Sequence, residues 1–542
     1  MADRTLTLRI LRQDPVTHDE PHYVTYTVPR RPRMSLLEAL QDVYRKDPTL
    51  TFPHSCRIGK CGSCTVRLNG NPVLACRYIV DNAEEFVLEP IANFPVDKDL
   101  LVDRSPFERT IIESLALFGN IQNAEWQPEG LLRDFSVSYK SLTECVECLA
   151  CDSICPVLRA APDLYFGPAN TATMAGPGPR LQSRGGEDRG VPVPSNIDYC
   201  AFCLNCELVC PANIPFQRLN AATKDAYFAE KGRPLHDEVT GRIGMLAKTL
   251  SHVPAAGSIQ RSRIAKVLLD WLLEFDQRMD LPTFSSANNS WVKQPHPSSD
   301  PRPRVAFFVG CFARYIDTEV GRLTAEVLEH NGITVRVPDQ QCCGMPMLSK
   351  GDLAGAKRLG EQNIKAFQSL VDEGYDIISA CTSCSWMLKK GYTVALQMDE
   401  ARRVAAHAYD LGEYLLKLKR LGRLDTDFKP VTSSLVYHAP CHLRSQKIGT
   451  PFLEILRAVP GLALRDETKT CCGLAGTYGF KKGKYEVAAA VGLDLFKAIQ
   501  NSGATVAISE CGTCRLQIAH GTSMDTDHPV SILHSAYFGE VN

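Results

Sequence analysis

The sequence has no apolar run long enough to cross a membrane, which for a helix takes about 20 residues. The best candidate, 264–275, is short and carries charges at Lys266, Asp270 and Glu274. The N-terminal segment MADRTLTLRILRQD places charge inside its first apolar run and alternates as a strand does, so it lacks the form of a signal peptide. We therefore expect a cytoplasmic protein without a direct membrane span, which reaches the inner face of a membrane only through a partner.

The sequence also has almost no net charge. Its 60 basic and 61 acidic side chains give a formal charge of −1, which provides no general attraction to nucleic acid, so no nucleic-acid partner is expected. With 542 residues, 44% of them apolar, the chain is globular and too long for a single hydrophobic core. Its length favours three or four domains.

A flavin or dinucleotide fingerprint is missing as well. No G-x-G-x-x-G opens a helix after the first predicted strand. We expect no flavin in this chain, so any hydride chemistry belongs to a partner.

Cysteine, in contrast, is abundant and highly organised. All 22 cysteines fall into five groups with ligand-like spacing, and none is left over. In a reducing compartment, grouped cysteines are more often metal ligands or catalytic thiols than disulfides. The cysteines therefore predict a protein that holds iron and sulfur.

The first group has the spacing C-x4-C-x2-C-x11-C and consists of Cys56, Cys61, Cys64 and Cys76. This is the plant-type [2Fe–2S] pattern, with three thiolates on one tight loop that Gly59 and Gly62 allow to bend. Two predicted strands, 5–12 and 22–28, and a helix opening at Ser35 precede it. A zinc site is the alternative, but zinc sites favour two short-spaced pairs.

Two further groups have the spacing C-x2-C-x2-C-x3-C-P. In two-cluster ferredoxins the fourth cysteine of each run binds the other cubane. We therefore expect two [4Fe–4S] cubanes in a helical region, and the Pro- and Gly-rich segment 160–196 lies between the two runs. One cubane is expected on Cys145, Cys148, Cys151 and Cys210, and the other on Cys155, Cys200, Cys203 and Cys206.

Beyond the polar, Pro-rich segment 285–304, the chain repeats itself. Five cysteines recur at offsets of 129 or 130 residues, which indicates two copies of one domain. Strands ending near cysteines alternate with helical runs such as 318–331 and 451–458, and this predicts an α/β layer fold with its ligands at strand ends. The two sets are Cys311, Cys342, Cys343, Cys381 and Cys384, and Cys441, Cys471, Cys472, Cys511 and Cys514.

Each repeat contains two adjacent cysteines followed by a glycine, Gly344 or Gly473. Two adjacent thiolates do not both suit one tetrahedral metal, so the pairs favour a cluster more open than a cube, with these glycines as candidate cofactor-binding positions. Three alternatives compete. A vicinal disulfide is disfavoured in a reducing compartment, zinc would use four of each five cysteines, and inert cysteines would not repeat at this spacing.

Two histidines flank the first cysteine of the second repeat. His438 and His442 are candidate catalytic residues that could donate a proton to a departing thiolate. The alternative is that they hydrogen-bond cluster sulfurs. Lys481, Lys482 and Lys484 could attract an anionic thiol, although a solvated face is the simpler interpretation.

Residues 1–220 resemble the iron–sulfur subunit of the succinate dehydrogenase and fumarate reductase family. The resemblance rests on TLRILRQDP, SCRIGKCGSC, LACRYIV, FPVDKDLLVD and the two ferredoxin runs. Quinone-binding members of that family usually have a [3Fe–4S] cluster as their third centre and an apolar residue at the position of Cys203. The cysteine here implies a cubane of lower potential as the third centre and puts a family-type quinone site in doubt.

The repeats resemble the CCG domains of a heterodisulfide reductase subunit and of electron-transfer subunits of glycolate, lactate and anaerobic glycerol-3-phosphate dehydrogenases. In the reductase, the resemblance implies, each five-cysteine set holds one non-cubane [4Fe–4S] cluster, and a disulfide is cleaved between the two. The fusion of both halves resembles the iron–sulfur subunits of thiol:fumarate reductases.

The expected fold class is multidomain α+β. It comprises a β-grasp [2Fe–2S] ferredoxin domain at 1–105, a helical two-cubane domain at 106–230, a helical segment and linker at 231–303, and α/β CCG domains at 304–425 and 426–542. The resemblance implies electron transfer between thiols of the coenzyme M and coenzyme B kind and a flavoprotein (FAD) partner that reduces fumarate to succinate. The alternative is a relay from a succinate- or 2-hydroxyacid-oxidising flavoprotein to a membrane quinone-binding subunit.

Overall fold

The computed structural model consists of two compact units. The first contains residues 1–200 and 204–223, and the second contains residues 201–203 and 224–542. Much of the Pro-rich segments 160–196 and 285–304 lies outside the described residues, as do residues 117–143 of the predicted helical domain. The structure describes residues 5–17, 19–80, 83–116, 144–174, 196–252, 262–285, 303–468 and 470–539.

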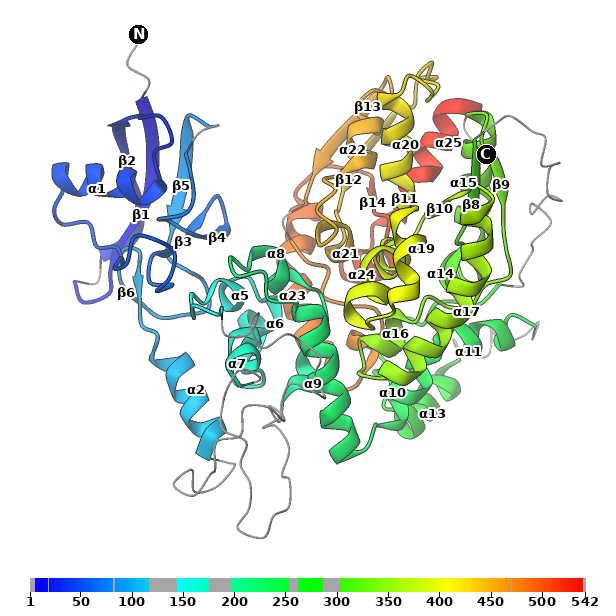
Figure 1. Ribbon diagram of the computed structural model, residues 1–542, viewed down its shortest axis with the longest axis horizontal. Helices are drawn as coiled ribbons and strands as arrows, with labels where there is room; N and C mark the ends of the chain where they lie inside the picture. Colours follow the sequence, from blue (N-terminus) through cyan, green and yellow to red (C-terminus); the bar gives the residue numbers. More distant parts are fainter. Residues whose placement is uncertain are drawn as a thin grey trace. The chain divides into compact units, whose positions relative to one another are not determined.

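The first unit begins with a five-stranded sheet in the order β2-β1-β5-β3-β4 (Figure 1). Antiparallel β1 and β2 correspond to the two predicted strands, and every second residue of β1 from Leu6 to Ile10 is fully buried, as alternation requires. The strands are β1 (Thr5–Asp14), β2 (Asp19–Pro29), β3 (Thr65–Leu68), β4 (Asn71–Leu74) and β5 (Glu85–Glu89).

Helix α1 (Leu36–Lys46) packs its apolar face into the core of this sheet. Ser35 caps it: the serine hydroxyl accepts from the backbone N–H of Glu38, and the Glu38 carboxylate accepts from the backbone N–H of Ser35. This capping box satisfies N–H groups that a helix start leaves without partners. The helix therefore begins where the sequence predicts it.

The rest of the first unit is built from short helices around the two ferredoxin runs. Helices α5 (Ala150–Ser153) and α8 (Asn205–Val209) occupy the same position in each run and lie against one another. The other elements are β6 (Val96–Lys98), β7 (Leu101–Val102), α2 (Ser105–Ala116), α6 (Pro156–Ala160), α7 (Gly167–Met174) and η2 (Ile197–Tyr199).

A run of helices leads to the repeats. It comprises α9 (Phe216–Lys231), which contains the boundary between the units, α10 (Leu235–Gly241), α11 (Ile243–Leu250) and α13 (Arg263–Leu273). Among the described residues no helix combines the length and apolarity needed to span a membrane. Helix α13 is amphipathic, because its exposed apolar side chains recur every three or four residues and so lie on one face; they are Ile264, Val267, Leu268, Trp271 and Leu272.

The second unit contains two four-stranded parallel sheets of the same topology (Figure 1). Their orders, β11-β10-β8-β9 and β13-β12-β14-β15, coincide when one is read backwards. The first sheet has β8 (Arg304–Phe307), β9 (Thr334–Arg336), β10 (Asp376–Ser379) and β11 (Ala408–Asp410). The second has β12 (Ser433–Tyr437), β13 (Leu462–Asp466), β14 (Val506–Ile508) and β15 (Asp525–Asp527).

Helices complete each repeat. The first has α14 (Gly310–Tyr315), α15 (Thr318–His330), α16 (Met345–Leu348), α17 (Leu353–Asp372), α18 (Thr382–Trp386), η3 (Met387–Ala395), η4 (Asp399–Ala401), α19 (Arg402–Ala406) and α20 (Leu411–Arg420). The second has α21 (Cys441–Arg444), α22 (Pro451–Leu456), η5 (Tyr478–Phe480), α23 (Tyr485–Gln500), α24 (Gly512–Thr522) and α25 (Pro529–Phe538). The predicted helices 318–331 and 451–458 correspond to α15 and α22.

The two repeats share one hydrophobic core. It combines side chains of β8 and α15 with those of β12 and α25, including Phe307, Val327, Tyr437 and Leu533. Because burial of apolar area is the main favourable contribution to folding, this shared core packs the two repeats together within the second unit. The predicted fold class, multidomain α+β with two α/β repeats, is confirmed.

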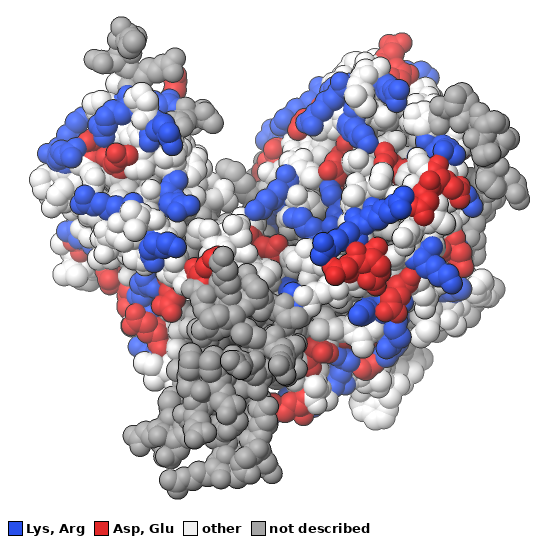
Figure 2. Space-filling view, viewed as in Figure 1, with Lys and Arg blue, Asp and Glu red and all other residues white. Residues whose placement is uncertain are grey.

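Charged side chains of both signs occur on the visible face of each unit (Figure 2). This mixture agrees with the formal net charge of −1. A surface of this kind favours solubility without a strong field for an oppositely charged polymer.

Candidate functional site

The cysteines of the first group lie on the loop between α1 and β3 and just after β4. Backbone N–H groups point at their sulfurs, from Lys60 to Cys56 at 3.2 Å and from Cys56 to Cys61 at 3.4 Å. A hydrogen bond from Ser63 lowers the pKa of Cys61 to about 6, whereas burial raises that of Cys64 to about 12. N–H groups aimed at thiolates are what an anionic iron–sulfur site needs.

Gly62 allows this loop to meet the first ferredoxin run. It has a φ of +67°, and a Cβ there would clash with the carbonyl oxygen of Val146 and lie 2.8 Å from the Cα of Cys148. Only glycine tolerates both constraints. The [2Fe–2S] loop and the first cubane motif are therefore in direct contact within the first unit.

The two ferredoxin runs have the same unusual backbone. Cys148 lies between Glu147 and Leu149, both with positive φ, and Cys203 has the same kind of flanking residues, Phe202 and Leu204. Positive φ is strained for such residues and persists only where the surroundings impose it. The repetition of this strain at corresponding cysteines indicates loops shaped around a ligand.

Cysteines of the two runs lie near one another across the first unit. Burial, together with the nearby thiols of Cys210 and Cys145, raises the pKa of the Cys148 thiol to about 11. Burial is the main cause of the raised pKa of Tyr165. The thiols of Cys200, Cys155 and Cys206 also raise it, so these three cysteines lie near Tyr165. Proximity of Cys210 to the first run is the arrangement that exchange of the fourth ligand requires.

In the first repeat, the five cysteines form a continuous chain of thiol contacts. Cys342 contacts Cys311 and Cys343, and Cys384 contacts Cys343 and Cys381. Gly244 of α11 closes over this group, since a Cβ there would lie 2.6 Å from the Cβ of Cys342 and 3.6 Å from that of Cys311. Helix α11 therefore covers the cysteines at backbone distance.

The second repeat gathers its cysteines in the same way. The sulfurs of Cys472 and Cys514 are 3.3 Å apart, and Cys472 also contacts Cys471. A hydrogen bond from Cys514 lowers the pKa of Cys511 to about 7, whereas burial raises that of Cys441 well above its ordinary value.

Glycines follow both adjacent cysteine pairs and turn the chain. Gly344 and Gly473 have φ values of +85° and +87°. A Cβ on Gly344 would lie 3.2 Å from the carbonyl oxygen of Ala356, and one on Gly473 would clash with that of Ala488. These contacts belong to the following helices, α17 and α23, so the glycines pack each cysteine pair against its repeat.

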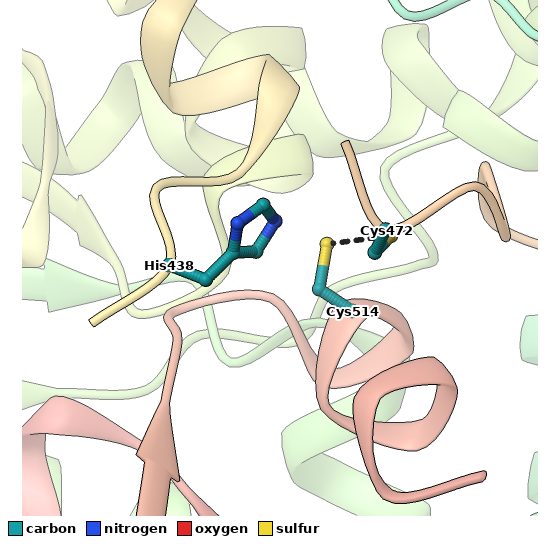
Figure 3. Close-up of side chains that lie close together, drawn as sticks. All are labelled: His438, Cys472 and Cys514. Carbon is teal, nitrogen blue, oxygen red and sulfur yellow. Dashed lines mark hydrogen bonds between the residues drawn. The ribbon is translucent and has the colours of Figure 1, made fainter. Parts of the chain in front are cut away.

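The two candidate histidines occupy different environments. His438 is 1% exposed, and one of its ring nitrogens lies within 4.8 Å of the sulfurs of Cys472 and Cys514, which lie within the same distance of each other (Figure 3). His442 stacks on Trp386 and uses both ring nitrogens, Nδ1 to the Ser383 hydroxyl at 2.8 Å and Nε2 to the carbonyl oxygen of Phe202 at 3.1 Å. Both ring nitrogens of His442 therefore have hydrogen-bond partners within the protein.

His442 also brings the two repeats together at their cysteines. Ser383 lies between Cys381 and Cys384 of the first repeat, and His442 follows Cys441 of the second. Within the second unit, Cys203 is close enough to Cys441 to contribute to the raised pKa of its buried thiol. Three cysteine loops therefore converge on this imidazole.

The prediction that Lys481, Lys482 and Lys484 form a solvated face is wrong for two of the three. Lys482 is exposed and pairs with Asp270, but Lys481 and Lys484 are buried. Lys481 binds Asp237, a carboxylate on α10 that sequence reasoning missed. The local sequence around Lys481 does not reveal that this side chain is buried, because its counter-charge, Asp237, lies on a distant helix.

The donor sets fit iron–sulfur clusters. All 22 cysteines are free thiols, with no disulfide among them. Five clustered sulfurs exceed the four ligands of a structural zinc site, and thiolates are the ligands of iron–sulfur clusters. Buried thiols with raised pKa values lose their protons readily only when a cation replaces them.

Three family models match the chain. They are a 2Fe-2S iron-sulfur cluster binding domain at residues 7–109, a 4Fe-4S dicluster domain at 141–214, and a cysteine-rich domain at 305–389 and again at 435–519. The repeat of the third model agrees with the repeated sheets.

Three curated relatives are informative. A fumarate reductase (CoM/CoB) subunit of Methanothermobacter marburgensis is 30% identical over 95% of this chain and 94% of its own length. An anaerobic glycerol-3-phosphate dehydrogenase subunit of Escherichia coli is 30% identical over 73% of this chain and 98% of its own. The fumarate reductase iron-sulfur subunit of Haemophilus influenzae is 31% identical over 39% of this chain and 88% of its own.

Proposed function

Because the chain belongs to the family of iron–sulfur proteins that includes this fumarate reductase (CoM/CoB) subunit, we propose that it couples thiol oxidation at its repeats to fumarate reduction on a partner. The chain is an iron–sulfur electron-transfer subunit. Two thiols, of the coenzyme M and coenzyme B kind, become one disulfide and release two electrons and two protons. Fumarate takes up two electrons and two protons to become succinate.

The contact between the two cysteine-rich sites carries this proposal. Oxidation of two thiols to one disulfide releases two electrons. Because an iron–sulfur cluster transfers one electron at a time, two neighbouring clusters can accept both. Ser383, inside the CxxC loop of the first repeat, is hydrogen-bonded at 2.8 Å to His442, which adjoins Cys441 of the second. The shared hydrophobic core keeps the two loops together.

The cysteines named above would hold one [2Fe–2S] cluster, two [4Fe–4S] cubanes and two non-cubane [4Fe–4S] clusters. When bound, these groups supply one-electron transfer. The residues of this chain bring the ligand loops together: in the first unit Gly62 admits the backbone of Val146, and in the second Phe202 accepts the hydrogen bond of His442. These contacts support electron transfer between neighbouring ligand loops within each unit.

The carbon chemistry belongs to a flavoprotein (FAD) partner. No dinucleotide fingerprint is present in the sequence, and reduction of a carbon–carbon double bond needs hydride transfer that iron–sulfur ligands do not provide. The relation of the N-terminal part to a fumarate reductase iron-sulfur subunit supports a partner of this class.

Anaerobic electron paramagnetic resonance (EPR) of the chain with its flavoprotein tests the proposal. Addition of coenzyme M and coenzyme B, or of their heterodisulfide, should produce a substrate-dependent signal from a repeat cluster. Metal analysis should give about 18 iron atoms per chain and no zinc. Zinc in place of iron, or repeat signals that no thiol perturbs, would overturn the thiol assignment.

A second candidate function is a relay to membrane quinone. It is supported by the relative named for anaerobic glycerol-3-phosphate dehydrogenase and by the apolar face of α13, where Ile264 is 76% and Trp271 79% exposed. Large exposed apolar side chains grouped on one helix mark interaction surfaces. If the chain is a quinone relay, the apolar face of α13 docks on a membrane-bound quinone-binding partner.

The two functions make opposite predictions for one variant pair. If the relay is correct, Trp271→Glu should reduce recovery of the complex with the membrane fraction several-fold, and a short-chain quinone analogue should perturb a cluster signal. Leu421→Glu, at a position that is 60% exposed elsewhere in the second unit, is the control. Equal recovery of both variants, together with a thiol-dependent signal, favours thiol oxidation.

A further inference from the structure

The two repeats differ at one buried position beside their cysteines. Phe308 lies three residues before Cys311 in the first repeat, and His438 lies three residues before Cys441 in the second. Both side chains are almost fully buried, at 0% and 1% exposure. Phe308 packs against Phe367 with ring centroids 5.6 Å apart, so the first site has hydrocarbon where the second has imidazole.

The imidazole of His438 is oriented toward two cysteines. Its Nδ1 lies 3.4 Å from the carbonyl oxygen of Glu467, and the opposite edge of the ring, with Nε2, is on the side of the Cys514 sulfur (Figure 3). Cys472 lies beside Cys514. Histidines that bind metal centres commonly donate their second N–H to a backbone carbonyl, which orients the ring in this way.

Burial makes this orientation significant. A ring nitrogen without water needs a partner inside the protein, because an unpaired buried polar atom costs about 1–3 kcal/mol. Hydrogen bonds from Cys471 and Cys514, joined by one from His438, hold the pKa of Cys472 well below its ordinary value. Phenylalanine can make no such contact, so the first repeat has no equivalent at this position.

We propose that the His438 imidazole contacts the second repeat's cluster at the edge held by Cys472 and Cys514, and raises its reduction potential above that of the first. The physical reason holds for either form of contact. An N–H donated to sulfur stabilises the added electron, and a neutral nitrogen ligand on iron does the same, as histidine ligands do in Rieske centres.

The inference rests on the proposed function only in requiring a cluster in each repeat. It makes the two clusters inequivalent, with the more oxidising one in the repeat whose Cys441 lies near Cys203. Electrons released at the paired sites are then drawn toward the second repeat.

Pulsed EPR on the complete wild-type chain tests the contact without any change in the protein. Protein labelled with ¹⁵N-histidine should show a nitrogen coupling in the spectrum of one repeat cluster. The coupling should be absent in His438→Phe, which copies the residue of the first repeat.

Redox titration followed by EPR tests the effect on potential. His438→Phe should shift the more oxidising repeat cluster to lower potential, with about a tenfold change in its ratio of reduced to oxidised form, or about 59 mV. Phe308→His should raise the potential of the other cluster. His438→Gln, which retains an N–H donor, should restore part of the shift if the contact is a hydrogen bond.

The outcomes separate the two claims. If the repeat clusters give normal EPR signals but show no histidine coupling, the inferred His438 contact is wrong. If their potentials are unchanged in His438→Phe, the inferred effect on potential is wrong. Neither result contradicts the proposed function. Absence of any cluster signal from the repeats would overturn both the proposed function and this inference. Iron content equal to wild type shows that a variant's shift does not come from cluster loss.

Discussion

Lys350 donates a hydrogen bond of 2.6 Å from Nζ to Oδ1 of Asp237, and both side chains are nearly removed from water. Lys481 reaches the other carboxylate oxygen at 3.2 Å. Lys350 follows the cysteine pair of the first repeat, and Lys481 follows that of the second. One carboxylate on α10 therefore ties the two repeats together.

Removal of this carboxylate should destabilise the second unit. Burial opposes ionisation of Asp237, but the charges of Lys350 and Lys481 outweigh it and hold the pKa well below its usual range. Asp237→Asn leaves buried ammonium groups without their counter-charge, at a cost of about 3–5 kcal/mol. Thermal unfolding followed by circular dichroism should show a lower melting temperature, to the same extent from pH 6 to 8, because Asp237 stays ionised throughout.

Asp399→Asn is the matched control for that experiment. Asp399 forms an exposed pair with Arg402, and such pairs contribute at most about 1 kcal/mol. An equal loss of stability in the two variants would contradict the role given to the buried pair.

Acid should destabilise the protein partly through His528. Burial, together with the charge of Arg515, lowers its pKa to about 3. The unfolded state, with a pKa near 6.5, binds the proton first, so stability is complete above that pH and falls as pH decreases toward 3. At pH 5 the loss from this residue is about 2 kcal/mol.

His528→Asn isolates this contribution. The imidazole Nδ1 accepts from the N–H of Val530 at 3.0 Å and caps α25, a role that the asparagine oxygen can take without titrating. Denaturant unfolding at pH 7 and pH 5 should show wild type losing more stability than the variant. Identical pH dependence would show that His528 does not titrate in this range.

Gly473→Ala should disrupt the second repeat. The added Cβ would clash with the carbonyl oxygen of Ala488 at a φ of +87°, whereas Gly476, at +69°, has no atom within 4 Å of that position. Backbone strain alone costs about 1 kcal/mol, so Gly476→Ala should lower the free energy of unfolding only slightly. Gly473→Ala should lower it several times more and should also reduce the iron content. Iron analysis and melting temperatures of both variants check this, and a mild Gly473→Ala would contradict it.

Cys203→Ser should convert one cubane to a three-iron centre. Removal of a single thiolate leaves one iron without its protein ligand, and that iron is lost first. Cys148→Ser, at the corresponding position of the first run, is the matched change, and EPR should show a three-iron signal in each. An unchanged spectrum for Cys203→Ser would refute Cys203 as a ligand.

Much of the fold follows from local patterns. Alternation in residues 5–12 predicted a strand because side chains of one face must be buried together, and Ser35 with Glu38 marked the start of a helix. The offset of 129 or 130 residues predicted two α/β repeats, and the two sheets have the same topology. These features depend on short-range geometry, which sequence spacing records.

Contacts between distant segments were not predictable in this way. Nothing near Lys481 in the sequence indicates that it is buried against Asp237, 244 residues away. His442 was a candidate proton donor from its position beside Cys441, but its two nitrogens contact Ser383 and Phe202. Only the folded chain brings these partners together.

The sequence by itself determined the chemistry of this protein, because thiolate spacing within a loop decides which clusters the loop can hold. It also determined that the C-terminal half is a duplication. Tertiary structure decided that the two repeats share one core and meet at Ser383 and His442, and that His438 and Phe308 stand in equivalent places with different chemistry. The physical reason is that burial and charge pairing arise from packing between segments far apart in the chain, which no local pattern encodes.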